Sequence, residues 1–142
     1  MTRGFSLLEV IIVMALLAIV FSLGALFSTS AIARANALSE RDLFVSLLTA
    51  TRAKALANID ESPQSLYIDT NDFVTYEGTT YSSGNTTNRR ISKVSKAGIS
   101  GQQTFTFAQL SGDALSGIGT TTIDGGAQKY TVNINTVGRI DW

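Results

Sequence analysis

The chain has 142 residues, a length that favours one modest domain. Lysine and arginine together number 11, and so do aspartate and glutamate, so the formal net charge gives no indication of a nucleic-acid or membrane-surface role. The chain has neither histidine nor cysteine. Disulfide scaffolds, thiolate zinc sites, cysteine nucleophiles and Ser-His-Asp triads are therefore excluded.

The N-terminal segment is much more apolar than the rest of the chain. Residues 5–27 are apolar except for Ser6, Glu9, Ser22 and Gly24. As a helix, these residues would extend for about 35 Å, enough to cross a hydrocarbon core of about 30 Å. The sequence therefore predicts a transmembrane helix at residues 5–27.

Glu9 is the residue that fits this segment least, because a carboxylate inside a bilayer costs on the order of 2–3 kcal/mol and marks a functional hypothesis. No lysine or arginine lies between Glu9 and Arg34, and Arg3 is off the i,i+4 spacing that would place it beside Glu9. We therefore expect a cation from another molecule to compensate Glu9. Cleavage just before Phe5 would create such a cation, the new α-amine, at the same depth in a neighbouring helix.

The residues around Glu9 also form a recognisable signal. Residues 3–10, with the sequence RGFSLLEV, and the apolar run after them resemble the class III signal of type IV prepilins and type II secretion pseudopilins. The resemblance implies that a prepilin peptidase cuts after Gly4 and methylates the new N-terminal residue, Phe5. It also implies that Glu9 contacts the N-terminus of a neighbouring subunit and sets the register during filament growth.

Two other interpretations of this segment stay open. A secretory signal peptide would have a shorter apolar run and a small-x-small cleavage site, which residues 31–33 and 33–35 could supply. A plain single-span anchor would leave Glu9 to snorkel towards the membrane interface. In that second case the chain would be a single-pass membrane protein that never polymerises.

The helical pattern continues through residues 28–58, which contain no proline and no glycine. Apolar residues recur there at spacings of three, four and seven, and charged residues such as Arg34 and Glu40 mostly fall elsewhere. The apolar stripe consists of Leu38, Val45, Leu48, Ala55, Leu56 and Ile59, with Phe44 beside it. We therefore expect an amphipathic helix with one packed face, which ends near Asn58 ahead of Pro63.

After Pro63 the apolar period changes from helical to alternating, which predicts half-buried strands. The turn signal Asp124-Gly125-Gly126 predicts a hairpin between residues 120–123 and 129–135. Residues 78–101 are expected to form a loop with one strand around residues 91–95. The alternating residues are Leu66, Ile68, Phe73, Phe105, Phe107, Tyr130, Val132 and Ile134. A long helix followed by an antiparallel sheet is an α+β plan of the type IV pilin kind.

The predicted head carries a second, looser resemblance, to GspH/FimT-type pseudopilins. It begins with residues 50–55, which include Arg52, and the strand at residues 64–69. It continues in the later motifs Phe105-Thr106-Phe107, residues 117–123, residues 130–134 and Gly138-Arg139-Ile140. This resemblance implies a β-rich head of the pseudopilin kind.

Two blocks of opposite charge lie in the head. Residues 60–77 contain five acidic residues and no basic one, whereas the basic block consists of Arg89, Arg90, Lys93 and Lys96. Complementary blocks suit lateral contacts between identical subunits, where they set register and partner choice. Two solvated loops are the simpler interpretation, and a DNA contact through the basic block is a third, although four cations supply limited phosphate affinity.

The sequence shows no catalytic constellation, so we expect a structural protein, without cofactor or metal, and not an enzyme. The expected organisation is a leader at residues 1–4, a transmembrane and assembly half-helix at 5–27, an amphipathic half-helix at 28–58 and a β-rich head at 59–142. The expected function is that of a pilus or pseudopilus subunit in secretion, adhesion, motility or DNA uptake, with a DNA-binding minor pilin as an alternative. The expected partners are other subunits, the prepilin peptidase, an assembly platform protein and, before assembly, the cytoplasmic membrane. The head would lie outside the cytoplasm, and the assembled filament would be extracellular or periplasmic.

Overall fold

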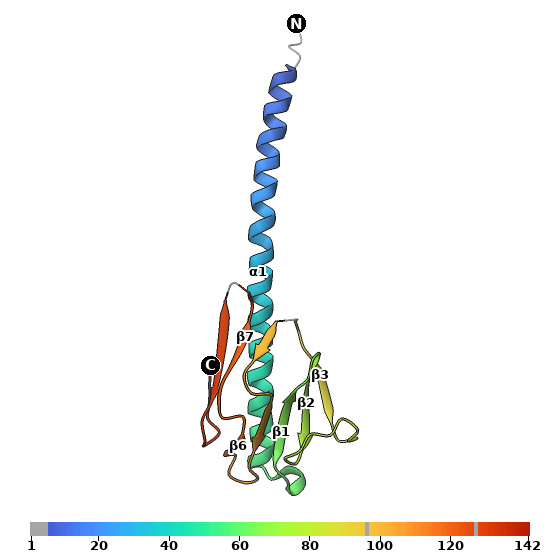
Figure 1. Ribbon diagram of the computed structural model, residues 1–142, viewed down its shortest axis with the longest axis vertical. Coiled ribbons are helices and arrows are strands. Elements are labelled where there is room, and N and C mark those ends of the chain that lie inside the picture. Colours follow the sequence, from blue (N-terminus) through green and yellow to red (C-terminus); the bar gives the residue numbers. More distant parts are fainter. Residues whose placement is uncertain (1–5, 96, 127) are drawn as a thin grey trace.

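The structure, a computed structural model, describes residues 6–95, 97–126 and 128–142, without the side chains of residues 23–29. One long helix, α1 (Leu7–Leu56), extends far beyond a β-rich body at its C-terminal end (Figure 1). We call residues 7–36 the stalk and residues 37–142 the head. This is the α+β, type IV pilin-like architecture that the sequence predicts.

The head contains two antiparallel sheets instead of the single sheet expected. The order of strands is β3-β2-β1-β5-β6 in the first sheet and β4-β7-β8-β9 in the second, and α1 packs against both. The strands of the first sheet are β1 (Gln64–Ile68), β2 (Asp72–Glu77), β3 (Arg89–Ser92), β5 (Thr104–Phe107) and β6 (Ala114–Ser116). Those of the second are β4 (Gly98–Ser100), β7 (Gly119–Asp124), β8 (Lys129–Ile134) and β9 (Ile140–Asp141), and a 3-10 turn, η1 (Ile59–Glu61), follows α1.

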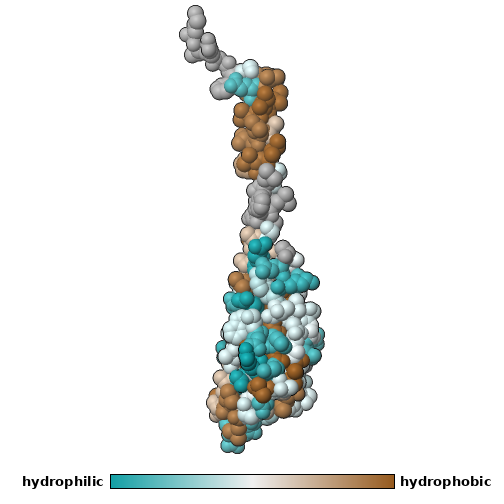
Figure 2. Space-filling model, turned by 90° about the vertical axis from the view of Figure 1, so that its left-hand side faces the viewer, coloured by the Kyte–Doolittle hydropathy of each residue, from teal (hydrophilic) through white to brown (hydrophobic). Residues whose placement is uncertain are grey.

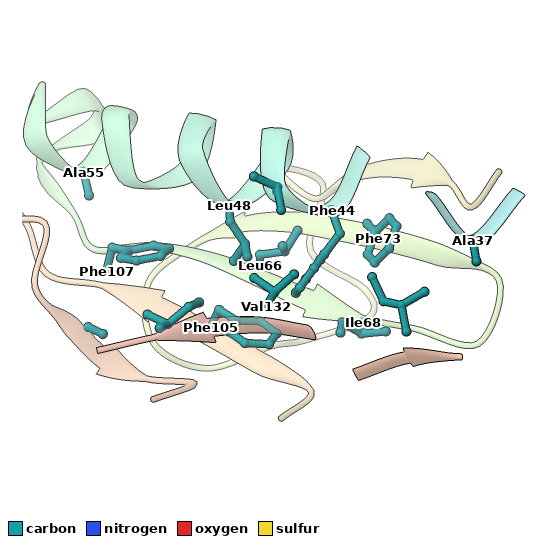
Figure 3. Packing of buried hydrophobic residues seen from close by; sticks show 14 residues of the cluster. Ala37, Phe44, Leu48, Ala55, Leu66, Ile68, Phe73, Phe105, Phe107 and Val132 are labelled. Carbon is teal, nitrogen blue, oxygen red and sulfur yellow. The ribbon is translucent and has the colours of Figure 1, made fainter. Parts of the chain in front are cut away.

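Aromatic side chains join α1 to the first sheet at the centre of the core (Figure 3). The ring of Phe44 lies 5.6 Å from that of Phe73 and 5.3 Å from that of Phe105, and all three side chains are fully buried. Aromatic pairs at these distances stabilise a core beyond the area that they bury. Val132 adds the second sheet to the same cluster.

The predicted stripe of α1 is confirmed in part. Val45, Leu48 and Ala55 are buried, as is Phe44 beside them, whereas the other three residues of the stripe are 39–44% exposed: Leu38, Leu56 and Ile59. A prediction based on spacing alone could not choose between two overlapping stripes on one helix, because both repeat at three, four and seven residues. The large side chain of Phe44 decides which face turns inward.

The β7–β8 hairpin with its turn after Asp124 is confirmed. The strand expected around residues 91–95 lies instead at Arg89–Ser92, and two three-residue strands, β4 and β6, were not predicted. Three-residue strands carry too little apolar alternation to be read from the sequence. In the described part of the chain, no helix combines the length and the apolar character that a membrane span requires.

Candidate functional site

A side-chain cap stabilises the first turn of α1. Ser6 is the N-cap residue, and its hydroxyl oxygen accepts a hydrogen bond from the backbone N–H of Glu9 over 3.3 Å. Ser6-Leu7-Leu8-Glu9 fits the S-x-x-E pattern of a capping box, which could have been read from the sequence. A glutamate in the first turn also interacts favourably with the positive end of the helix dipole.

The predicted processing residues, Gly4 and Phe5, lie outside the described residues. The predicted span at residues 5–27 also includes side chains outside them, those of residues 23–29. Every described side chain from Ser6 to Ser22 is exposed, and Figure 2 shows most of this part of the stalk as an apolar surface, with a hydrophilic area at its N-terminal end. Glu9 is exposed at the N-terminal end of that surface, where no residue of the head reaches it.

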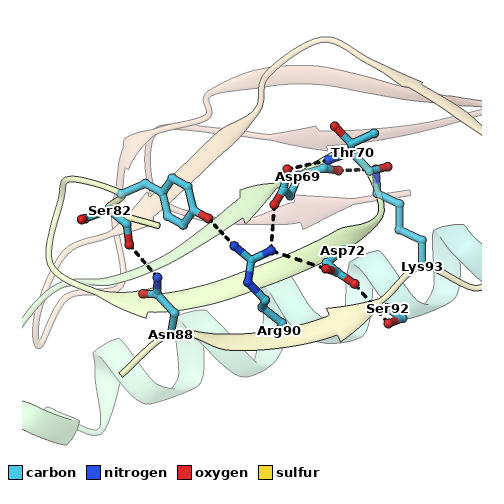
Figure 4. Close-up of polar contacts among 9 residues, drawn as sticks. Asp69, Thr70, Asp72, Ser82, Asn88, Arg90, Ser92 and Lys93 are labelled. Carbon is cyan, nitrogen blue, oxygen red and sulfur yellow. Dashed lines mark hydrogen bonds and ion pairs between the residues drawn. The ribbon is translucent and has the colours of Figure 1, made fainter. Parts of the chain in front are cut away.

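The two charge blocks of the head meet each other within one molecule (Figure 4). The guanidinium of Arg90 lies 2.8 Å from a carboxylate oxygen of Asp69 and 3.4 Å from one of Asp72, and it donates to the hydroxyl of Tyr81 over 2.9 Å. The hydrogen bond from Arg90 lowers the pKa of Asp69 below its ordinary value, and the backbone N–H of Thr70 adds to this effect. The same bond raises the pKa of Arg90.

Lys93 is also engaged within the head. Its ammonium donates to the carbonyl oxygens of Asp69, over 2.7 Å, and Thr70, over 3.2 Å, and it lies 5.6 Å from the centre of the Phe73 ring. Arg89 is exposed on the edge strand β3 and forms no ion pair with any described residue. Lys96, the fourth residue of the predicted contact set, lies outside the described residues.

Glu40 is where the structure differs most clearly from the prediction. The pattern placed it outside the packed face of the helix, but it is fully buried. Its Oε2 accepts a hydrogen bond of 2.8 Å from the backbone N–H of Ser95, while Oε1 has no partner among the described residues. Glu40 therefore anchors the connection between β3 and β4 to α1. The sequence carried no signal for this bond, because Ser95 lies 55 residues away.

The end of the head opposite the stalk is built around Arg52. Its guanidinium donates to the carbonyl oxygens of Gly112 and Val137, which ties two loops to the last turn of α1. A Cβ at Gly138 would collide with the carbonyl oxygen of Gly112, and Gly138 has a φ of 70°. Only glycine allows this close approach, so Arg52, Gly112 and Gly138 form one interlocked junction.

Comparison with protein families identifies only the N-terminal segment. Residues 1–25 match the family model described as the prokaryotic N-terminal methylation motif. No curated protein and no solved structure matches the chain. The matched residues include Gly4, Phe5 and Glu9.

Proposed function

We propose that the chain is the precursor of a structural, non-enzymatic subunit of a type IV pilus or type II secretion pseudopilus. A prepilin peptidase cuts it after Gly4 and methylates Phe5. The subunit waits in the cytoplasmic membrane with its head outside the cytoplasm, and an assembly platform protein then adds it to a helical filament. This proposal rests on two observations. The methylation motif lies at the start of α1, and the head does not cover the described side chains of the first half of this helix.

The exposed apolar stalk supports polymerisation. Side chains such as Leu7, at 79% exposure, and Phe21, at 76%, face outward along the described part of the stalk. An apolar surface of this extent requires lipid or other apolar helices around it. A membrane before assembly and a bundle of identical helices after it provide both environments.

We also propose that the head is of the GspH/FimT pseudopilin type, because motifs that carry this resemblance lie in strands of the head or in the turns that lead into them. Phe105-Thr106-Phe107 lies in β5, and Gly138 lies in the turn that leads into β9. The pairing of Arg90 with Asp69 and Asp72 favours a subunit role over a DNA contact, because a cation that carboxylates already neutralise releases few counterions from phosphate. Lys93 donates to backbone carbonyl oxygens and keeps its charge.

The processing step has a direct test. The full chain, expressed with a prepilin peptidase, is expected to lose residues 1–4 and to gain one methyl group on Phe5, as measured by mass spectrometry. Gly4→Leu is expected to remain full-length in the membrane. A mature protein that starts near Ala35, or an unprocessed wild-type chain, would contradict the proposal.

Glu9 requires a test that separates its charge from its position in the capping box. Glu9→Gln preserves the S-x-x-[E/Q] pattern but removes the charge, whereas Glu9→Ala removes both. If the carboxylate binds a neighbouring α-amine, both variants insert into the membrane but assemble poorly. Normal filament yield from Glu9→Gln, together with loss of filaments in Glu9→Ala, would assign Glu9 to helix capping alone.

A further inference from the structure

Exposed apolar side chains gather at the end of the head farthest from the stalk, where Figure 2 shows a brown surface. Leu56 and Ile59 come from the end of α1 and η1, Leu110 from the β5–β6 loop and Val137 from the β8–β9 turn, and they are 42–65% exposed. Contacts with α1 hold both loops at this end: Leu110 donates its N–H to the carbonyl oxygen of Ala55 over 2.9 Å, and Val137 accepts from Arg52. We call these four apolar residues the distal patch.

Leu110 is the residue that the fold explains least. It has a φ of 67°, a left-handed conformation that costs a leucine roughly 1–2 kcal/mol and that glycine or asparagine adopts at less cost. Its backbone satisfies the end of α1, a role that needs no leucine side chain, and its side chain is 65% exposed. A strained backbone that presents an apolar side chain to solvent is a recurrent feature of binding sites.

The charge around the distal patch indicates the occupant. Asp60 and Glu61, directly after Ile59, and Asp113, directly after Gly112, are exposed acids. The exposed cation nearby in the sequence is Lys54 on α1, while the guanidinium of Arg52 is engaged with the two loops, so the Ile59 side of the patch is acidic. The patch therefore suits an apolar surface that carries a cation.

The chain itself presents such a surface where the stalk meets the head. Ala31, Arg34, Ala35 and Leu38 follow the i, i+3, i+4, i+7 spacing of one helix face, and all four are exposed. Arg34 is the only charged residue among residues 30–39. We call these four residues the junction face.

Within one molecule the distal patch and the junction face cannot meet. Arg34 and Ala55 are separated by 21 residues of continuous helix, or about 32 Å. A second, parallel copy displaced by that length along α1 brings its junction face level with the distal patch of the first. The stalk of the second copy then runs beside the groove of about 310 Å³ between α1 and Trp142, which Leu56 also lines.

We propose that the distal patch is the docking surface for the junction face of a second copy, with Asp60 and Glu61 opposite Arg34. The inference rests on the proposed function, because it specifies which surfaces meet when subunits polymerise. It makes the contact heterologous, so that each copy offers one surface at each end and the chain of contacts stays open.

Disulfide cross-linking tests the contact directly, because the chain has no cysteine of its own. Leu110→Cys combined with Ala35→Cys, in the full chain in membranes that carry the assembly machinery, is expected to give covalent dimers and higher ladders on oxidation. Ser83→Cys with Ala35→Cys, a pair with one exposed position in the β2–β3 loop, is the matched control. No more cross-linking from the Leu110 pair than from the Ser83 pair would overturn the proposal.

Substitution at Leu110 separates docking from folding. Leu110→Gly relieves the strain, so we expect an unchanged or higher melting temperature together with filament yield reduced by about tenfold, the effect of losing one buried leucine. Val94→Asn removes another exposed apolar side chain, away from the patch, and is expected to leave the yield unchanged. A lower melting temperature, or a normal yield, in Leu110→Gly would show that the leucine serves the fold and would overturn the proposal.

Charge reversal tests the polar part of the contact. Glu61→Lys and Arg34→Glu are each expected to reduce the yield of Leu110–Ala35 cross-links by roughly fivefold, and the double variant is expected to restore it. Failure of the double variant to recover would overturn the predicted pairing. If Glu9→Ala abolishes filaments while these variants assemble normally, the docking inference fails and the proposed function stands.

Discussion

The stalk and the part of α1 inside the head belong to one helix but lie in two different environments. The described side chains of the stalk are exposed whatever their chemistry, whereas in the head Phe44 and Leu48 of the same helix are fully buried. The head thus supplies its own covering from two sheets, and the stalk has none. An apolar segment that one molecule cannot cover belongs to an environment outside that molecule, either lipid or other subunits.

The two glutamates of α1 make the same contrast. Glu40 is buried in the head and accepts a hydrogen bond from Ser95, while Glu9 is exposed on the stalk and contributes only its backbone N–H to the Ser6 cap. The carboxylate of Glu40 has a partner within the molecule. That of Glu9 has no partner among the described residues.

The largest expected effect is a loss of stability in the head that leaves the stalk unaffected. Phe44→Ala removes the ring that packs against Phe73 and Phe105, so we expect the free energy of unfolding to fall by roughly 3–5 kcal/mol. Phe21→Ala is the matched control, because the same side chain is 76% exposed on the stalk and contributes nothing to the head. Chemical unfolding in detergent, followed by the fluorescence of Trp142, measures both, and equal losses would contradict the division into stalk and head.

Much of this division could be predicted from the sequence. The long apolar run, the change to alternation after Pro63 and the hairpin turn at Asp124 are local patterns, and local patterns survive folding. The N-terminal motif is equally local, so the family comparison finds the same residues. The division of the head into two sheets depends on which strands pair, and no local pattern encodes that pairing. The edge strands β4 and β6 are each only three residues long.

The remaining features of the site depend on residues far apart in the chain. The bond between Glu40 and Ser95 spans 55 residues, and that between Arg52 and Val137 spans 85. The charge blocks were visible in the sequence, but their pairing in one molecule was not, because a run of charges does not show where its strand will lie. The conformation of Leu110 likewise follows from where the loop meets α1, and leucine itself carries no turn signal.

The second prediction concerns the close contact between Gly138 and Gly112 at the far end of the head. Gly138→Ala would place a Cβ against the carbonyl oxygen of Gly112 at a positive φ, so we expect a loss of roughly 2–4 kcal/mol. Gly78→Ala is the control, because Gly78 also has a positive φ but no atom within 4 Å of the added Cβ, and a loss of about 1 kcal/mol is expected. Urea unfolding measures the difference, and similar losses would show that the close approach is unimportant.

The third prediction tests whether the hydrogen bond of Glu40, the buried glutamate of α1, stabilises the head. Glu40→Ala leaves the N–H of Ser95 without its acceptor, so the free energy of unfolding should fall by about 1–3 kcal/mol. Glu40→Gln retains an acceptor oxygen and should lose less. Thermal unfolding in detergent compares the two, and equal losses would show that the negative charge of Glu40, which both variants remove, holds the β3–β4 connection and that the hydrogen bond does not.

The smallest expected effect lies on the surface of the head, in the pair between Asp69 and Arg90. Because the pKa of Asp69 is lowered in the folded state, its ionised form stabilises the head at pH values above its ordinary pKa of 3.8. That contribution is lost as the pH falls through the lowered pKa, where the carboxylate becomes protonated. The pair is partly exposed, with 34% and 44% of its side chains accessible, so water and salt screen it.

Asp69→Asn should therefore be slightly less stable than the wild type near neutral pH, with a difference that disappears under strongly acidic conditions. Urea midpoints measured from neutral pH down to about pH 2 would show this convergence. Asp124→Asn serves as a control in the second sheet, because the N–H of Gly126, with help from Lys129, lowers the pKa of Asp124 independently of Arg90. In the double variant Asp69→Asn with Arg90→Gln, the pH dependence should match that of Asp69→Asn alone, since the guanidinium acts on the stability of the head mainly through that carboxylate. A further pH-dependent loss in the double variant would assign the greater share of the pairing to Asp72, which lies 3.4 Å from the same nitrogen.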